Sequence, residues 1–189
     1  MRAGLSTLPD TAEELAYELL APLGNRWRHT AGVAARAAEL AAPLEIDRDV
    51  LVAAAWLHDI GYAERTVVTG FHPLDGARHL ERLAWPAAII GLVAQHSGAR
   101  FVAAVRGLAE ELAAYPDDSG LISDALTYAD QTVGPDGRRV TAGQRHDEML
   151  RRHGPASWNA LVDHVRLPHL RGVTERVEHR LALAGAPGR

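Results

Sequence analysis

The chain has 189 residues, of which 47% are hydrophobic and 23% charged, a composition typical of a single globular domain. Its net charge of −4 argues against nucleic-acid polymers and anionic membranes as partners, because both attract a surplus of basic residues. The chain contains neither cysteine nor lysine, which excludes thiolate metal ligands, thiol nucleophiles and Schiff-base chemistry. Any bound metal must therefore be held by histidine and carboxylate groups.

The spacing of apolar residues predicts helices from the first element onward. Asp10 is expected to cap a helix that ends at 22–24, and Asn25 to cap a second helix through about residue 42. A third helix is expected after Asp47 and stops near Gly61. Because this third helix is apolar on nearly all sides, we expect it at the centre of a helical bundle.

The remainder of the chain also predicts helices and turns. Segment 62–71 is expected to be a loop, and Pro73 and Pro86 each to begin a short helix. Further helices are expected at about 101–114, 123–132 and 141–152, a turn at 134–139, and a final pair divided at Pro168. No alternating pattern is long enough for a sheet.

These elements predict a single all-α domain over 1–189, a compact bundle with a C-terminal helical extension at about 140–183. The segment MRAGLSTLPD has no basic patch followed by a long apolar run, so a cytoplasmic location is expected.

The ten histidines divide into two groups by their surroundings. Five of them lie among charged residues and are expected to face solvent: His146, His153, His164, His169 and His179. The others occur in apolar or turn segments, and these are the candidates for a buried site.

The strongest candidate is the pair His58-Asp59, which ends the apolar third helix. A buried imidazole beside a buried carboxylate costs several kcal/mol if left unpaired, on the order of 3–5. The negative end of the helix further favours a cation at this position. A metal ion would satisfy the imidazole, the carboxylate and the helix end together. The alternative is a simple hydrogen bond between His58 and Asp59 in the core. The second such pair, His146-Asp147, lies in a polar helix and is assigned to solvent.

Four further residues are candidates to join this pair. His29 has apolar neighbours on both sides and is otherwise a core histidine; His96 ends an apolar run as His58 does. His72 stands before a proline at a helix start, with His79 as the competing choice. Asp130 lies on an apolar helix face, where an internal cap or a salt bridge to arginine is the alternative.

The ordered set His29, His58-Asp59, His72, His96 and Asp130 resembles the HD superfamily of metal-dependent phosphohydrolases, and LHDIG matches the HDIG variant of its motif. The resemblance covers the metal-binding core at about 25–134. It implies one metal ion on His29, His58, Asp59 and Asp130, and a second on His72 and His96 with Asp59 bridging. His58 and Asp59 would be the catalytic pair.

The implied function is hydrolysis of a small phosphate ester or nucleotide by a metal-activated hydroxide at a dinuclear site. An imidazole-rich ligand set favours Mn, Fe, Co, Ni or Zn over a site for Mg alone. Arg26, three residues before His29, and Arg100, four after His96, are candidates to bind the substrate phosphate.

Departures from family patterns narrow the substrate. Ile60, Gly61 and Tyr62 follow the His–Asp pair where nucleotidases and guanosine-polyphosphate hydrolases carry an acidic residue. A single His96 and the lack of a Gly-Tyr-Pro motif likewise disfavour a cyclic dinucleotide.

Two other functions remain open from the sequence. The ligand set also resembles HD-fold mixed-valence diiron oxygenases, which act on phosphonate-like or other substrates by cleaving C–P or C–C bonds. Their tyrosine and glutamate are matched poorly by the adjacent Tyr17 and Glu18, because neighbouring helix positions point about 100° apart. The second alternative is a non-catalytic module that senses a ligand through its metal. A homodimer is neither predicted nor excluded.

Overall fold

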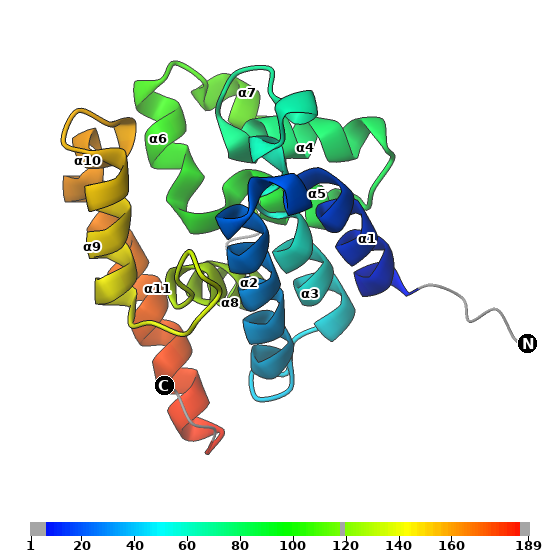
Figure 1. The fold of residues 1–189 in the computed structure, drawn as a ribbon. Helices are drawn as coiled ribbons and strands as arrows, with labels where there is room; N and C mark the ends of the chain where they lie inside the picture. Colours follow the sequence, from blue (N-terminus) through cyan, green and yellow to red (C-terminus); the bar gives the residue numbers. More distant parts are fainter. Residues whose placement is uncertain (1–6, 118–119, 186–189) are drawn as a thin grey trace, which may run out of the picture.

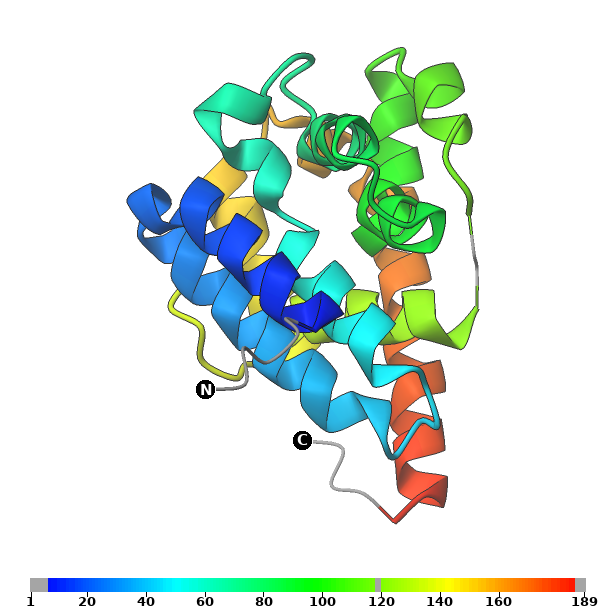
Figure 2. The same ribbon diagram turned by 90° about the vertical axis from the view of Figure 1, so that its right-hand side faces the viewer.

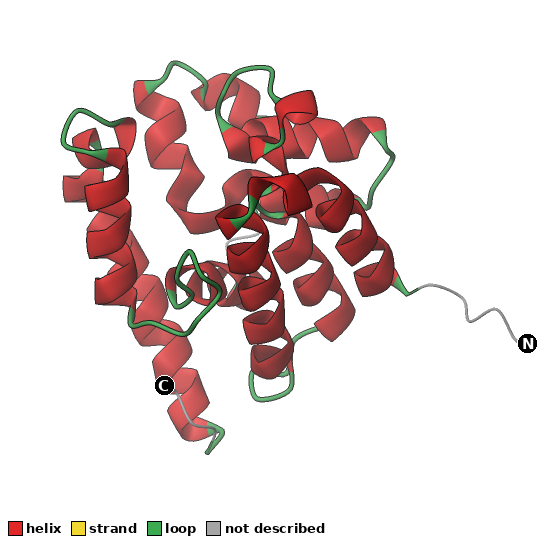
Figure 3. Ribbon diagram, in the orientation of Figure 1, coloured by secondary structure: helices red, strands yellow, loops and turns green. Residues whose placement is uncertain are grey.

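The computed structural model describes residues 7–117 and 120–185, and these are almost entirely helical (Figure 3). Among them the only β-type pairing is an isolated bridge between Val133 and Arg139, which closes the expected turn at 134–139. The predicted all-α fold is confirmed. Residues 1–6, on which part of the expected location rests, lie outside the described residues.

The first three helices pack side by side (Figure 1). They are α1 (Leu8–Leu20), α2 (Asn25–Ala41) and α3 (Arg48–Leu57). Helix α3 begins directly after Asp47 as predicted, and the Asp47 side chain caps it by accepting hydrogen bonds from the backbone amides of Asp49 and Val50. The central place of α3 is also confirmed, since every residue from Leu51 to Ala55 is buried. Two caps were predicted wrongly. Thr7 caps α1, and Asp10 completes the capping box from inside the helix. Gly24 occupies the cap position of α2, and Asn25 is the first residue of that helix.

The middle of the chain forms short helices joined by tight turns. These are η2 (Ile60–Tyr62), η3 (Glu64–Thr66), α4 (His72–Arg82), α5 (Ala87–Gln95), η4 (His96–Gly98), α6 (Ala99–Val105) and α7 (Ala109–Ala113). The predicted helix at 101–114 is divided at Gly107, whose φ of 71° is left-handed. Between α5 and α6 the chain turns through Ser97 (φ 53°) and Gly98 (φ 69°).

Segment Ala87–Val105 has the length and composition of a membrane-spanning helix, but 67% of it is buried within the protein. The turn at Ser97 and Gly98 divides it. It is therefore accounted for as a core segment.

The C-terminal helices gather on one side of the molecule (Figures 1 and 2). They are α9 (Ala142–His153), α10 (Trp158–Leu161) and α11 (Asp163–Leu183), and α11 packs along α8 (Leu121–Gln131). The predicted division at Pro168 is wrong, because the helices divide at Val162 and α11 continues through the proline. Pro168 removes one backbone donor, whereas buried contacts of residues such as Val173 and Val177 hold the helix together beyond it.

Candidate metal centre

The six predicted ligands come from five separate segments and meet in one buried cluster. They are His29 on α2, His58 and Asp59 directly after α3, His72 at the start of α4, His96 at the end of α5, and Asp130 on α8. They form two triads in which the ligand atoms all lie within 4.8 Å of one another: His29, His58 and Asp130, and then Asp59, His72 and His96. The structure thus brings together every residue predicted for the metal site.

Backbone carbonyl groups orient three of the imidazoles. His58 Nδ1 donates to the Ala55 carbonyl (2.6 Å), and His96 Nδ1 donates in the same way to Val93 (2.7 Å). Each bond uses one of the carbonyls that a helix C-terminus leaves without a partner. His29 Nδ1 lies 3.2 Å from the carbonyl of Gly134. Because a carbonyl only accepts, the bonds of His58 and His96 place the proton on Nδ1 and leave Nε2 with a lone pair that is directed inward. Nε2 of His29 lies 3.0 Å from Asp130 Oδ1.

The inward-facing Nε2 atoms of His58 and His96 have close neighbours that are themselves polar. His58 Nε2 is buried and has no hydrogen-bond partner, and it lies 3.4 Å from Asp59 Oδ2. His96 Nε2 lies 3.2 Å from His72 Nε2. The buried lone pair of His58 Nε2 beside a carboxylate is unfavourable unless a cation lies between them. The donor set therefore fits divalent metal ions.

Neighbouring charges and hydrogen bonds favour the ionised form of both aspartates in the cluster. Burial acts to raise the pKa of Asp59, but Arg26 and His58 outweigh it and hold that pKa well below its ordinary value. For Asp130, burial is likewise outweighed, here by the His29 hydrogen bond (3.0 Å) and by Arg145, so its pKa also lies well below the ordinary value. Both carboxylates are therefore ionised at neutral pH, as metal binding requires.

The pKa values of the buried imidazoles shift in different directions. Burial lowers the pKa of His72 strongly and that of His96 less strongly, which keeps both rings neutral at neutral pH. Burial also acts to lower the pKa of His58, but the adjacent Asp59 outweighs it and the net direction is upward. Asp59 thus favours positive charge at His58.

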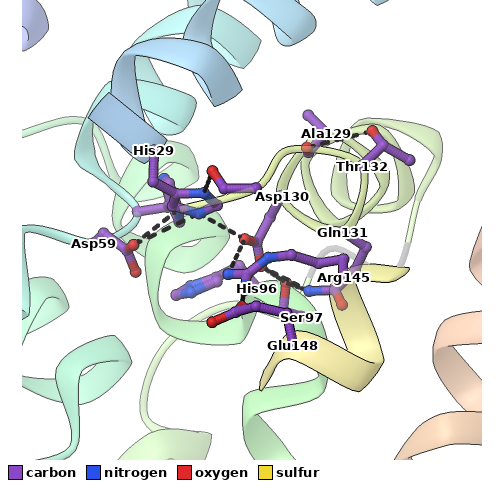
Figure 4. Close-up of polar contacts among 12 residues, drawn as sticks. His29, Asp59, His96, Ser97, Ala129, Asp130, Gln131, Thr132, Arg145 and Glu148 are labelled. Atoms are coloured by element: carbon purple, nitrogen blue, oxygen red, sulfur yellow. Dashed lines mark hydrogen bonds and ion pairs between the residues drawn. The ribbon is translucent and has the colours of Figure 1, made fainter. Parts of the chain in front are cut away.

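Three residues that the sequence did not single out hold Asp130 in place (Figure 4). Ser97 Oγ and Gln131 Nε2 both donate to Asp130 Oδ2, the latter over 2.8 Å, and Arg145 Nη2 lies 3.7 Å from Oδ1. Ser97 and Gln131 are each adjacent in sequence to a predicted ligand, which was the available signal. Arg145 gave none, because it lies in a polar helix that sequence reasoning assigned to solvent.

A cavity of about 340 Å³ opens onto the cluster. Asp59, His72, His96 and Asp130 line its floor, and aromatic side chains including Tyr62, Phe71 and Trp158 line its walls. Five arginines also line it: Arg26, Arg106, Arg145, Arg152 and Arg166. Three of these come from α9 and α11, so the C-terminal helices complete the cavity over the cluster of histidines and aspartates.

The two arginines predicted to bind substrate have different positions. Arg26 lines the cavity, pairs with Asp59 over 2.5 Å, and lies above the ring of Tyr62. Arg100 does not line the cavity; it is exposed, with its guanidinium near Phe101 and His169. The prediction for Arg100 assumed one continuous helix from His96, and the left-handed turn at Ser97 and Gly98 rotates it away.

The other histidines largely follow the predicted separation. His79 lies outside the cluster beside Arg82, whereas His72 lies within it. His146 was wrongly assigned to open solvent, because it is mostly buried and its Nε2 lies 2.8 Å from Asp163 Oδ1. His153 is exposed as expected, yet it lines the mouth of the cavity.

Comparison with known proteins identifies one family. A family model described as HD domain matches residues 26–131, more than half of the chain, and these residues contain all six cluster ligands. The search of curated proteins and the search of solved structures found no match. Helices α9 to α11 lie outside the matched segment.

Proposed function

The chain belongs to the HD domain family, whose members are mostly metal-dependent phosphohydrolases, and we propose that it hydrolyses a small phosphate ester or nucleotide at two divalent metal ions. One ion would be held by His29, His58 and Asp130, and the other by Asp59, His72 and His96. The observation that carries the proposal is the set of inward-facing Nε2 atoms fixed by backbone bonds, one of which is buried without a partner.

Asp59 is suited to contact both ions. Its Oδ1 lies 3.3 Å from His72 Nε2, and its Oδ2 lies 3.4 Å from His58 Nε2 and 3.8 Å from His29 Nε2. The two oxygens of one carboxylate thus face the two triads. This supports a bridging role for Asp59 and a dinuclear site.

Two such ions, when bound, supply an activated water and polarise the phosphoryl oxygens for an in-line displacement. The imidazole-rich ligand set favours Mn, Fe, Co, Ni or Zn. The protein contributes the orientation of its ligands and a positively charged cavity for the substrate. Arg26, which reaches Asp59 from the cavity wall, is placed to stabilise negative charge on a phosphoryl group as well as to keep Asp59 ionised.

The residues that would favour the oxygenase alternative lie elsewhere. Tyr17 is 59% exposed and packs against Trp27, and Glu18 forms a salt bridge with Arg65 (2.6 Å). Neither lines the cavity. Hydrolysis therefore remains the better-supported chemistry.

The test combines metal analysis with a hydrolysis screen. Chelator-treated protein is titrated with Mn²⁺, and we expect two equivalents to bind. His96→Gln removes a ligand from one triad and Asp130→Asn from the other, so each variant should retain the other triad's ion. The loaded wild-type protein is then screened against nucleotides and small phosphomonoesters and phosphodiesters, with Asp59→Asn as the inactive control.

The outcomes separate the alternatives. Hydrolysis that requires metal and is lost in Asp59→Asn supports the proposal. Tight metal binding without turnover of any phosphoester would instead indicate a sensing module. Less than half an equivalent of metal in wild-type protein would contradict the metal site itself.

A further inference from the structure

The cavity over the metal cluster carries more positive charge than one phosphate group needs. Five arginines and two aspartates line it, a surplus of three positive charges before any metal ion is bound. The chain as a whole has a net charge of −4, so the positive charge is concentrated here. A cavity of about 340 Å³ is near the lower end of the ~300–1,000 Å³ range of small-molecule sites. The ligand is therefore expected to be small and highly anionic.

Four of the five arginines already have strong partners within the protein. Arg26 pairs with Asp59, and both Arg145 and Arg152 pair with Glu148. Arg106 donates from both terminal nitrogens to the backbone carbonyls of Thr69 and Gly70, which fixes the loop before α4.

Among residues 7–117 and 120–185, neither Arg106 nor Arg166 forms an ion pair with a carboxylate, but only Arg166 leaves one terminal nitrogen, Nη2, without a hydrogen bond. Its Nε donates to the Ser97 carbonyl (2.9 Å), and its Nη1 makes a long contact with Asn159 Oδ1 (3.4 Å). Burial lowers the pKa of this guanidinium, although it remains charged. Arg166 is only partly exposed to water, and a partly buried cation without an anionic partner carries a cost that an anionic ligand would offset.

The position of Arg166 is fixed beside the metal ligands. Ser97, which accepts its hydrogen bond, itself donates to Asp130. The aliphatic part of Arg166 packs on Gly98, where an added Cβ would lie 3.5 Å from Cγ of the arginine. The guanidinium is thus held at the cavity wall before any ligand arrives, and its planar donors suit phosphate or carboxylate oxygens.

We propose that Arg166 binds a second anionic group of the substrate, so that this cavity takes small phosphate esters that carry a further phosphate or carboxylate. This inference rests on the proposed phosphohydrolase function, in which the metal ions hold the first phosphoryl group. Arg166 lies on α11, outside the segment that matches the family, so the C-terminal helices determine the substrate class.

Non-hydrolysable phosphonates test this directly. The probes are phosphonoacetate, 3-phosphonopropionate and 4-phosphonobutyrate, each compared with the alkylphosphonate of similar length that lacks the carboxylate. Their affinities for Mn²⁺-loaded protein are measured by isothermal titration calorimetry. We expect the best-fitting carboxylated probe to bind about tenfold more tightly than its partner, as a charge-assisted hydrogen bond allows.

The variant Arg166→Gln should remove most of this tenfold difference and leave the alkylphosphonates almost unaffected. Arg166→Lys keeps the charge without the planar fork and should retain part of the difference. Arg100→Gln is the matched control, because Arg100 is exposed and contacts the same helix through His169 but lies outside the cavity. It should behave as the wild-type protein does. Thermal unfolding of each variant checks that the fold is retained.

Several outcomes would overturn the inference. These are equal affinity of the paired probes for wild-type protein, and an Arg166→Gln variant that weakens both members of a pair equally or neither. Failure of the proposed function is distinguishable from these results. If the alkylphosphonates do not bind, the proposal that metal ions hold the phosphoryl group is wrong. Binding of the carboxylated probes that depends on Arg166 would in that case still support the anion site. Absence of all binding would overturn both.

Discussion

Gly61 packs directly against the backbone of α4 beside the cluster of histidines and aspartates. The variant Gly61→Ala tests whether this close packing is needed for stability and for metal binding. A Cβ at this position would lie 2.0 Å from the carbonyl oxygen of His72 and 2.7 Å from the backbone nitrogen of Gly76. Both atoms belong to the backbone of α4, so neither can rotate away. The helix start must move by more than an ångström to reach the 3.4 Å of an ordinary contact. That shift carries His72 away from Asp59, whose Oδ1 is now 3.3 Å from its Nε2.

We expect Gly61→Ala to lower the free energy of unfolding by about 3 kcal/mol or more, the upper part of the range for overpacking a rigid site. For a chain of this size that corresponds to a fall in Tm of roughly 6–12 °C. Metal affinity at the triad containing His72 should also fall by about tenfold or more, because ligand orientation is lost. Urea denaturation measures the first effect, and Mn²⁺ titration of the folded variant measures the second.

The matched control is Gly143→Ala. It lies near the start of α9, its φ is not left-handed, and the nearest atom to an added Cβ is Thr141 Oγ1 at 3.9 Å. This change should be neutral or stabilising by up to about 1 kcal/mol. A Gly61→Ala protein as stable as wild type with undiminished metal binding would refute the packing argument.

Three further predictions concern charge, the C-terminal helix and the choice of chemistry. The lowered pKa of Asp130 contributes stability that is present above its unfolded value near 3.8 and lost as pH falls. Metal-free wild-type protein should therefore lose stability more steeply than Asp130→Asn from about pH 5 to about pH 2.5 in urea denaturation, and parallel curves would contradict this. Pro168→Ala restores a backbone donor inside α11 and should stabilise the protein by up to about 3 kcal/mol; an unchanged urea midpoint would show that the helix already accommodates the proline. Protein produced in iron-replete medium and exposed to air should show no mixed-valence diiron resonance at low temperature, whereas a strong signal would favour the oxygenase.

The helical class, the pair His58-Asp59 and His96 were predictable because they depend on local patterns, whereas His29, His72 and Asp130 were added to the set by the resemblance to the HD superfamily. Apolar runs that end in His58 and His96 indicate buried polar groups whatever the surrounding fold. The boundary expected at Pro168 failed because tertiary contacts hold α11 together through the proline. Sequence periodicity cannot supply such contacts.

The cavity was harder to predict than the metal cluster. Arg100 was chosen by helical spacing, and the spacing failed because Ser97 takes a left-handed conformation that is uncommon for a residue other than glycine. Arg145 and Arg166 were not predicted, because their helices read as polar surface segments. Only their packing over the cluster makes them part of the cavity.

The bonds from imidazole Nδ1 atoms to the main chain limit how this site can change. In many metal sites an acidic side chain orients each histidine, and replacing that side chain alters the basicity of the ligand. Here His58 and His96 are oriented by the carbonyls of Ala55 and Val93, which persist whatever side chains those positions carry. Substitution would therefore change the properties of a bound metal mainly through the two aspartates and the arginines around them. The orientation of these histidines therefore depends on the backbone at the helix ends, whereas mutations of the surrounding side chains can change the reactivity and the selectivity of the site.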